Sequence, residues 1–168
     1  MKIDIITYKD ELEQDLKSML GDYLKLVAKE VKHDPWRFEI NIPEAIDFTF
    51  KNLNDFTPPK GKILIAQKSK QSVGTASIKK IRPETAEIKR MYVKPEYRGN
   101  GIGNLLLENA LEEAKRMNAK EILLDSPPPF KPSHQLYEKY GFKIFQEYPE
   151  VAIPAELKVE WVYMKKIL

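Results

Sequence analysis

The stretch MYVKPEYRGNGIGNLLLENALEEAK, residues 91–115, places three alternate glycines between an apolar run and a helical run. Gly99, Gly101 and Gly103 are three of only seven glycines in the chain. Glycine loses more conformational freedom on folding than other residues, so three in one short loop need a structural reason. A sharp turn supplies one reason, and a ligand that lies against the backbone supplies another. The stretch therefore predicts a strand, a tight loop and a helix, in that order.

The junction between strand and helix predicts an anion site. The first N–H groups of a helix have no partner within the helix, and they lie at the positive end of its dipole. Without side chains at the glycines, a diphosphate-sized anion can approach them, and Arg98 adds a guanidinium at the mouth of the loop. A tight turn that binds nothing is the alternative. Because such a turn rarely needs three glycines, we favour the anion site.

Two common phosphate-binding loops fit this stretch poorly. The P-loop ends in Gly-Lys-Ser/Thr, which the chain lacks. The dinucleotide fingerprint has the spacing G-x-G-x-x-G, whereas residues 99–103 read G-x-G-x-G. Asp125 follows at about the distance of a ribose-binding acid, which favours an oxidoreductase. However, the loop comes late in the chain and follows an antiparallel pattern, so we rank that reading last.

Apolar periodicity predicts the remaining elements. Helical spacing covers 10–35, 43–53, 102–118 and 133–140, and strand patterns cover 3–8, 62–68, 73–81, 86–94, 121–125, 142–148 and 160–167. Short connections predict antiparallel neighbours among the second to fourth strands, and a helical crossover makes the fifth parallel to the fourth. The order β-α-α-β-β-β-α-β-α-β-β predicts one α/β domain over residues 1–168. Its mixed, mostly antiparallel twisted sheet would be flanked by helices.

Composition narrows the class of protein. With 42% hydrophobic and 32% charged residues, the chain is typical of a globular domain. A net charge of +3 on interleaved lysines and acids does not predict nucleic acid binding. No apolar run is long enough for a bilayer, so we expect no membrane association. The absence of cysteine favours a cytoplasmic location. His33 and His134 lie far apart without ligand partners, so we expect no metal site, and we expect His134 to face solvent.

Two segments carry a family resemblance. The loop RGNGIG resembles the R/Q-x-x-G-x-G/A acyl-CoA pyrophosphate loop of the GNAT superfamily of N-acetyltransferases. EIKRMYVKPEYRGNGIGNLLLENALEEA resembles that superfamily's fourth strand, loop and third helix, and LYEKYGFK, residues 136–143, resembles its late helix and following strand. The close similarity covers residues 85–145. It implies a GNAT-like fold and an acetyl-CoA-dependent N-acetyltransferase.

The resemblance also implies how the donor is held. Met91, Tyr92 and Val93 would align the pantetheine arm of acetyl-CoA as if it were another strand. Backbone N–H groups of the loop would bind the pyrophosphate; these belong to Arg98, Gly99, Asn100, Gly101, Ile102, Gly103 and Asn104. Because such contacts are made by the backbone, side-chain identity does not test them.

Tyr137 and Glu87 are the catalytic candidates. By resemblance, Tyr137 is the general acid that protonates the departing thiolate, although its helical spacing would also suit a packing residue. Glu87 is the candidate general base, and strand alternation places it on one face with Lys89, Met91 and Val93. The alternative for Glu87 is a surface charge or a pair with Lys89. Asp125 is a second candidate, as base or as anchor for the amine.

The acceptor side is less defined. Many family members carry asparagine seven residues before the tyrosine, where this chain has Phe130, so the loop 126–132 is expected to wall the acceptor site instead. The aromatic segment HDPWRF, residues 33–38, is either a substrate lid or a plug in the core. We expect a small-molecule or peptide amine as acceptor, and a homodimer through the last strands is plausible. A non-catalytic acyl-CoA-binding regulatory module is the alternative function.

Overall fold

The computed structural model describes residues 2–158 and 160–168, and over these residues the order of elements is the predicted one. The strands are β1 (Asp4–Thr7), β2 (Gly61–Lys68), β3 (Gln71–Arg82), β4 (Thr85–Val93), β5 (Glu121–Ser126), β6 (Lys143–Phe145) and β7 (Val162–Ile167). The helices are α1 (Glu13–Val31), α2 (Ile42–Lys51), α3 (Ile102–Arg116) and α4 (Lys131–Lys139). Short 3-10 turns cover Asp10–Leu12, Leu53–Phe56, Pro95–Tyr97 and Ala155–Lys158.

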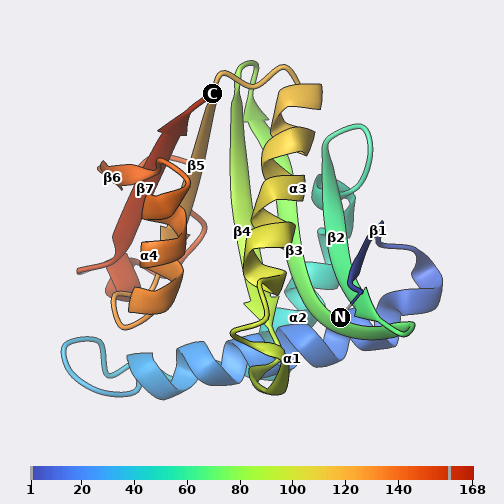
Figure 1. Cartoon of the computed structure of the whole chain (residues 1–168). Coiled ribbons are helices and arrows are strands. Elements are labelled where there is room, and N and C mark those ends of the chain that lie inside the picture. Colours follow the sequence, from blue (N-terminus) through green and yellow to red (C-terminus); the bar gives the residue numbers. More distant parts are fainter. Residues whose placement is uncertain (1, 159) are drawn as a thin grey trace.

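The described strands form one seven-stranded sheet in the order β1-β2-β3-β4-β5-β7-β6 (Figure 1). All neighbouring strands are antiparallel except β4 and β5. This arrangement confirms the mixed, mostly antiparallel sheet and the parallel crossover through α3. The parallel pairing is short, since it joins Thr85–Ile88 to Glu121–Leu124 and ends there. Beyond it the two strands separate, and Figure 1 shows the gap widening toward the lower end of β4.

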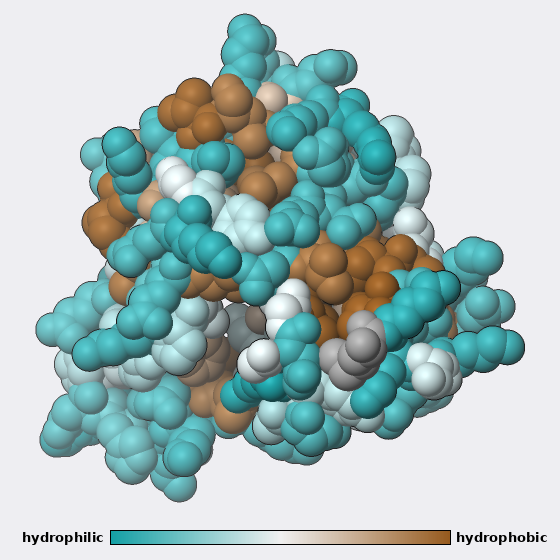
Figure 2. All heavy atoms as spheres, in the orientation of Figure 1, coloured by the Kyte–Doolittle hydropathy of each residue, from teal (hydrophilic) through white to brown (hydrophobic). Residues whose placement is uncertain are grey.

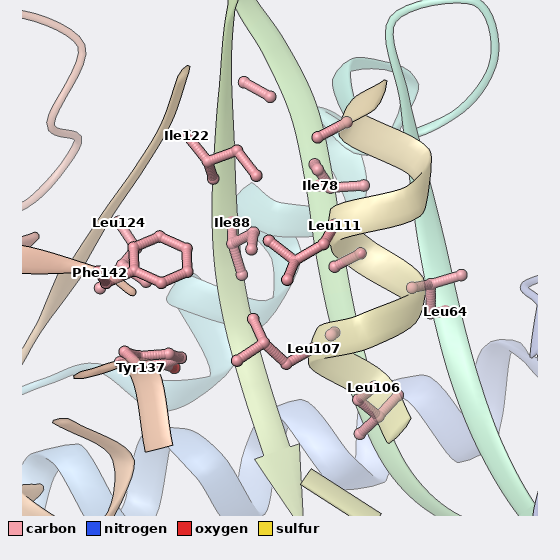
Figure 3. Packing of buried hydrophobic residues seen from close by; sticks show 14 of the residues in the cluster. Leu64, Ile78, Ile88, Leu106, Leu107, Leu111, Ile122, Leu124, Tyr137 and Phe142 are labelled. Carbon is pink, nitrogen blue, oxygen red and sulfur yellow. The ribbon is translucent and has the colours of Figure 1, made fainter. Parts of the chain in front are cut away.

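Helices cover both faces of the sheet. Helix α3 lies on the face toward the viewer in Figure 1, and α1 and α2 lie behind the sheet. Figure 3 shows the core on the α3 face, where strand residues such as Ile88 and Ile122 pack with Leu107 of the helix. On the other face, Leu16 and Met19 of α1 pack against neighbouring strands. The apolar spacing of three and four in α1 and α3 therefore produces the buried stripes that hold the layers together.

A β-bulge in β4 changes which side chains share a face. Thr75 pairs with Tyr92 and Ser77 with Lys89, so Arg90 and Met91 both stand opposite a single residue of β3. Arg90 has a φ of 53°, as a bulged residue can. Met91 and Val93 consequently pack in the α3-face core with Ile88. The expectation that they share a face with Glu87 and Lys89 is wrong, because the extra residue inverts the alternation.

The end of β6 also differs from the prediction. The strand pattern extends to Tyr148, yet β6 ends at Phe145, where its pairing with β7 stops. Tyr148 instead turns inward and is buried in a third core cluster with Leu123 and Trp161. The aromatic ring of Tyr148 explains why this position fits a strand pattern. In the structure, however, the ring packs against residues of other elements instead of extending β6.

None of the helices in the described residues has the length and apolar character of a membrane-spanning segment.

We expect Ile122→Ala to destabilise the fold by about 2–5 kcal/mol, because the side chain is fully buried between α3 and the sheet. The same substitution at Ile144, whose side chain is 69% exposed on the edge strand, is expected to cost less than about 1 kcal/mol. Urea unfolding of both variants measures the difference. An equal loss of unfolding free energy in the two variants would contradict the assignment of Ile122 to the core.

Candidate active site

The loop before α3 is held by its own side chains. The Nε of Arg98 donates to the carbonyl of Val93 at 2.9 Å, and the amide of Asn100 donates to the carbonyls of Tyr97 and Arg98, both at 3.1 Å. Gly99 and Gly101 both have a φ of +76°, a left-handed conformation that favours glycine. A Cβ at either position would meet open space, so the backbone angle is what requires glycine there.

The N-terminus of α3 is open to a ligand. Gly101 is its N-cap and offers no side chain to bond the first-turn N–H groups. The N–H of Leu105 bonds the carbonyl of Gly101 at 3.1 Å, whereas those of Ile102, Gly103 and Asn104 precede the helical ladder. These groups lie at the positive end of the helix dipole, which suits an anion.

Gly103 has a different role from the other two glycines. A Cβ there would lie 3.3 Å from Leu136 of α4 and 3.7 Å from the methyl group of Met91. The missing side chain therefore lets α3 and α4 pack closely beside the end of β4. Sequence reasoning assigned all three glycines to one loop, because the approach of α4 could not be seen in the local pattern.

Where β4 and β5 separate, they leave a small pocket of about 20 Å³, roughly enough for one ordered water molecule. It is lined by Tyr23, Ile88, Lys89, Arg90, Met91, Asp125, Ser126, Pro127, Phe130, Ser133 and Tyr137. Figure 2 shows the surface hollowed beside α4 in this region of the molecule. Beyond Ile88, β4 has no ladder to β5, so this edge of the strand can accept an extended ligand.

Tyr137 reaches this pocket from α4. Its ring lies 5.8 Å from that of Phe142, and the two stand beside the gap in Figure 3. The residue is buried, and within the described part of the chain its hydroxyl has no hydrogen-bond partner. Burial, with smaller contributions from Tyr23 and Asp125, raises the pKa of Tyr137 above its ordinary value. The hydroxyl therefore keeps its proton at neutral pH and remains a donor.

Glu87 and Asp125 are brought together by a buried lysine. The Nζ of Lys89 lies 3.1 Å from Oε1 of Glu87 and 2.7 Å from Oδ1 of Asp125. Glu87 is fully buried, and its Oε1 also accepts from the hydroxyl of Tyr148 at 2.8 Å. The indole N–H of Trp161 donates to Oδ2 of Asp125 at 3.0 Å. The predicted contact between Glu87 and Lys89 exists, but it is buried rather than on the surface.

The charge of Lys89 is maintained by this arrangement. Burial alone would lower the pKa of Lys89, but Asp125 and then Glu87 outweigh it, and the pKa is raised. Both carboxylates therefore face a permanent cation at neutral pH. Of the two predicted bases, Asp125 lines the pocket, whereas Glu87 lies behind Lys89.

The loop after β5 walls the pocket, as Phe130 and Pro127 line it. The expectation that His134 faces solvent is wrong, since its Nε2 lies 3.0 Å from the hydroxyl of Ser126, and burial lowers its pKa. In the segment 33–38, the ring of Trp36 packs edge-on against Trp161 at 6.4 Å. The other residues of that segment are mostly exposed, so it is a surface loop held by Trp36 rather than a plug in the core.

The sequence model of the Acetyltransferase (GNAT) family matches residues 28–142, well over half of the chain. The chain belongs to the GNAT acetyltransferase family. It is 29% identical over 120 residues to an uncharacterised N-acetyltransferase of Schizosaccharomyces pombe, covering 66% of this chain and 74% of that protein. The chain spans less than two thirds of the length of the other curated relatives that it matches.

Solved structures of GNAT proteins and other acetyltransferases share the fold. An acetyltransferase of Streptococcus agalactiae superposes with a TM-score of 0.76 at 25% identity, covering 99% of this chain and 98% of that one. A PaiA N-acetyltransferase of Thermoplasma acidophilum, solved with coenzyme A, gives a TM-score of 0.77 at 22% identity over the full length of both chains. The predicted family and fold are thereby confirmed.

In this GNAT acetyltransferase, sequence reasoning missed the residues that organise the buried charges. Strand alternation places Lys89 on the face of Glu87 and offers it as a pair, but nothing in the local sequence indicates that Lys89 also bonds Asp125. Tyr148 and Trp161 come from segments late in the chain, and no local pattern connects them to β4.

We expect Lys89→Met to destabilise the protein by about 3–5 kcal/mol at neutral pH, because it leaves Asp125 without its cation and Glu87 with only the more distant Lys79 at 3.7 Å. Since the folded pKa of Lys89 is raised, its contribution is complete below the unfolded value of about 10.4 and is lost as the pH rises through the folded value. The stability difference from the wild type should therefore shrink in strongly alkaline solution. Urea unfolding across this range measures it.

The matched control is Lys25→Met, which removes an exposed pair with Asp22 and should cost at most about 1 kcal/mol. A Lys89→Met difference that stays constant at all pH values would argue against the buried ion pair.

Proposed function

We propose that the protein is an acetyl-CoA-dependent N-acetyltransferase in which a primary amine of a small molecule or peptide attacks the thioester directly. The observation that carries the proposal is the open edge of β4, which runs from the pocket beside Tyr137 to the exposed N-terminus of α3. One end of this path suits a reacting centre and the other suits a diphosphate. The Thermoplasma neighbour, solved with coenzyme A, supports this donor.

In the proposed complex the donor completes the interrupted sheet. Backbone groups of Met91, Tyr92 and Val93 pair with the pantetheine arm in the gap that β5 leaves. The N–H groups of the loop Arg98–Asn104 bind the pyrophosphate, with the N-terminal dipole of α3 behind them. An N–H group of the open edge would also polarise the thioester carbonyl, where negative charge develops during attack.

We propose that Asp125 receives the amine. It is the carboxylate that lines the pocket, and only two of its lone-pair sites are used by Lys89 and Trp161. Glu87 remains a candidate for general base, and because it does not line the pocket itself it would act through a water molecule. In either case, the base removes a proton from the ammonium so that the nitrogen lone pair can attack the carbonyl carbon.

Tyr137 is proposed as the general acid. The reference pKa is about 8.5 for a thiol and about 10 for tyrosine, so proton transfer to the thiolate is uphill in water. Burial raises the pKa of Tyr137 further. Burial would also raise the pKa of the bound thiol, because it disfavours the thiolate. In the proposal, Tyr137 gives its proton to the sulfur as the C–S bond breaks and negative charge develops there.

The proposal also covers the extent of the domain, its location in the cell and its oligomeric state. We treat residues 1–168 as one catalytic domain and place it in the cytoplasm because the chain has no cysteine. A homodimer would use the edge strand β6 and its neighbour β7, where Ile144 and Ile167 are exposed.

We expect acetyl-CoA to bind with micromolar affinity and Gly101→Glu to abolish this binding, because a carboxylate would then face the pyrophosphate. Gly101→Ala is the control, since it imposes the same left-handed backbone strain, about 1–2 kcal/mol, without the charge. Calorimetric titration compares the three proteins. Equal binding by wild type and Gly101→Glu would remove the loop from the donor site.

We expect Tyr137→Phe to lower kcat by about 100-fold or more while the Kd for acetyl-CoA stays unchanged, as for a lost general acid. The control is Tyr163→Phe, because this hydroxyl is also buried, has no partner among the described residues and does not line the pocket. Release of free CoA thiol measures turnover. Full activity in Tyr137→Phe would refute the assigned role, and donor binding without turnover of any amine would favour a regulatory module.

A further inference from the structure

Arg90 differs from the other arginines of the chain in its polar contacts. The other four arginines of the chain each donate to an acceptor: Arg37 to Asp34, Arg82 to Glu150, Arg98 to the carbonyl of Val93, and Arg116 to Glu113. All four are exposed, whereas Arg90 is partly buried. Within the described residues, the guanidinium of Arg90 forms neither an ion pair nor a hydrogen bond. Among the described residues, the least exposed arginine is thus the one whose guanidinium donates no hydrogen bond.

The position of Arg90 is set by the bulge in β4. With a φ of 53°, the residue breaks the alternation of the strand, and its Cζ lies 4.8 Å from the centre of the Phe56 ring. This stacking holds the guanidinium but satisfies none of its N–H donors. Burial lowers the pKa of Arg90, although arginine stays protonated at neutral pH. A partly buried cation without protein acceptors is stabilised when water or a ligand supplies them.

Arg90 also lines the pocket at the separation of β4 and β5. Tyr23 of α1 lines the same pocket, and burial followed by the charge of Asp125 raises the pKa of Tyr23 to about 12, so its hydroxyl is a donor. Asp125 supplies acceptor oxygens in the same pocket. The walls thus offer donors for an anion and acceptors for a cation.

We propose that Arg90 binds a carboxylate of the acceptor, so that the acceptor is a small amine that also carries a carboxylate, as an amino acid does. This inference rests on the proposed acetyl transfer. The ammonium of such a molecule would face Asp125, and its carboxylate would meet the forked donors of Arg90 with help from Tyr23. A guanidinium suits a carboxylate because its parallel N–H groups match both oxygens. A polyamine would instead bring a second cation toward Arg90.

The test compares acceptors that differ only in the carboxylate. Free amino acids are paired with their C-terminal amides, and γ-aminobutyrate with n-butylamine, and kcat/KM is measured from released CoA thiol. We expect the wild type to prefer at least one carboxylated member by roughly 10- to 100-fold, the range for hydrogen bonds to a charged group. Arg90→Met should abolish the preference by lowering kcat/KM only for the carboxylated member. Arg90→Lys should retain part of it.

The control is Arg82→Met, the same substitution at an exposed arginine that pairs with Glu150 outside the pocket lining. It should leave the preference unchanged. Calorimetric titration with acetyl-CoA shows whether each variant still folds and binds the donor, which separates this proposal from the acetyl transfer itself. Turnover of amines with equal kcat/KM for both members of every pair would overturn the role of Arg90 and leave the transferase standing.

Binding of the acetylated products gives a second readout that does not depend on turnover. With CoA present, N-acetyl amino acids and their C-terminal amides are each titrated into the protein, and calorimetry compares their affinities. Tighter binding of the carboxylated product to wild type, lost in Arg90→Met, would support the proposal. If no pair differs in turnover or in binding, the proposal is wrong.

Discussion

The separation of β4 and β5 is the constraint on which the rest of the site depends. Parallel strands need a long crossover, and here α3 supplies it between the two central strands of the sheet. The pairing ends at Ile88 and Leu124, so the core stays closed above this point while the backbone of β4 is open below it. The same crossover begins with the N-terminus of α3. An open strand edge and an anion-binding helix end are therefore consecutive along one short stretch of chain.

Buried charge accompanies this opening. Carboxylates from β4 and β5 face the same side of the gap, and Lys89 joins them where strand pairing has ended. Removing water from three charges is costly, and close geometry with added donors from Tyr148 and Trp161 offsets much of that cost. The cluster fixes the distance between the strands beside the gap. The gap that would admit a ligand is therefore held at the end where β4 and β5 are still paired.

The sequence predicted the parts of this structure that depend on local chemistry. The order of elements, the loop at Gly99 and Gly101 and the placement of Tyr137 beside the gap follow from periodicity, glycine conformation and the motif around 136–143. The bulge at Arg90 could not be predicted, because it depends on the register between β3 and β4. The roles of Gly103 and Tyr148 depend on contacts with distant segments, Leu136 and Glu87 respectively. Local patterns determine which elements form, and long-range register determines which side chains meet.

Three kinds of polar group without a partner meet at the gap between β4 and β5. Within the described residues, the open backbone of β4, the hydroxyl of Tyr137 and the guanidinium of Arg90 make no hydrogen bond or ion pair, and all three border one pocket. Other buried polar atoms without a partner, such as the hydroxyls of Thr75 and Tyr163, lie outside the pocket lining. Groups of this kind lower the stability of the free protein, and an unfolded chain would satisfy them with water. They persist where a bound ligand can satisfy them, because a ligand that binds only the folded state stabilises it. The meeting of a strand edge, a hydroxyl and a guanidinium without partners at one gap therefore supports the proposal that donor and acceptor bind between β4 and β5.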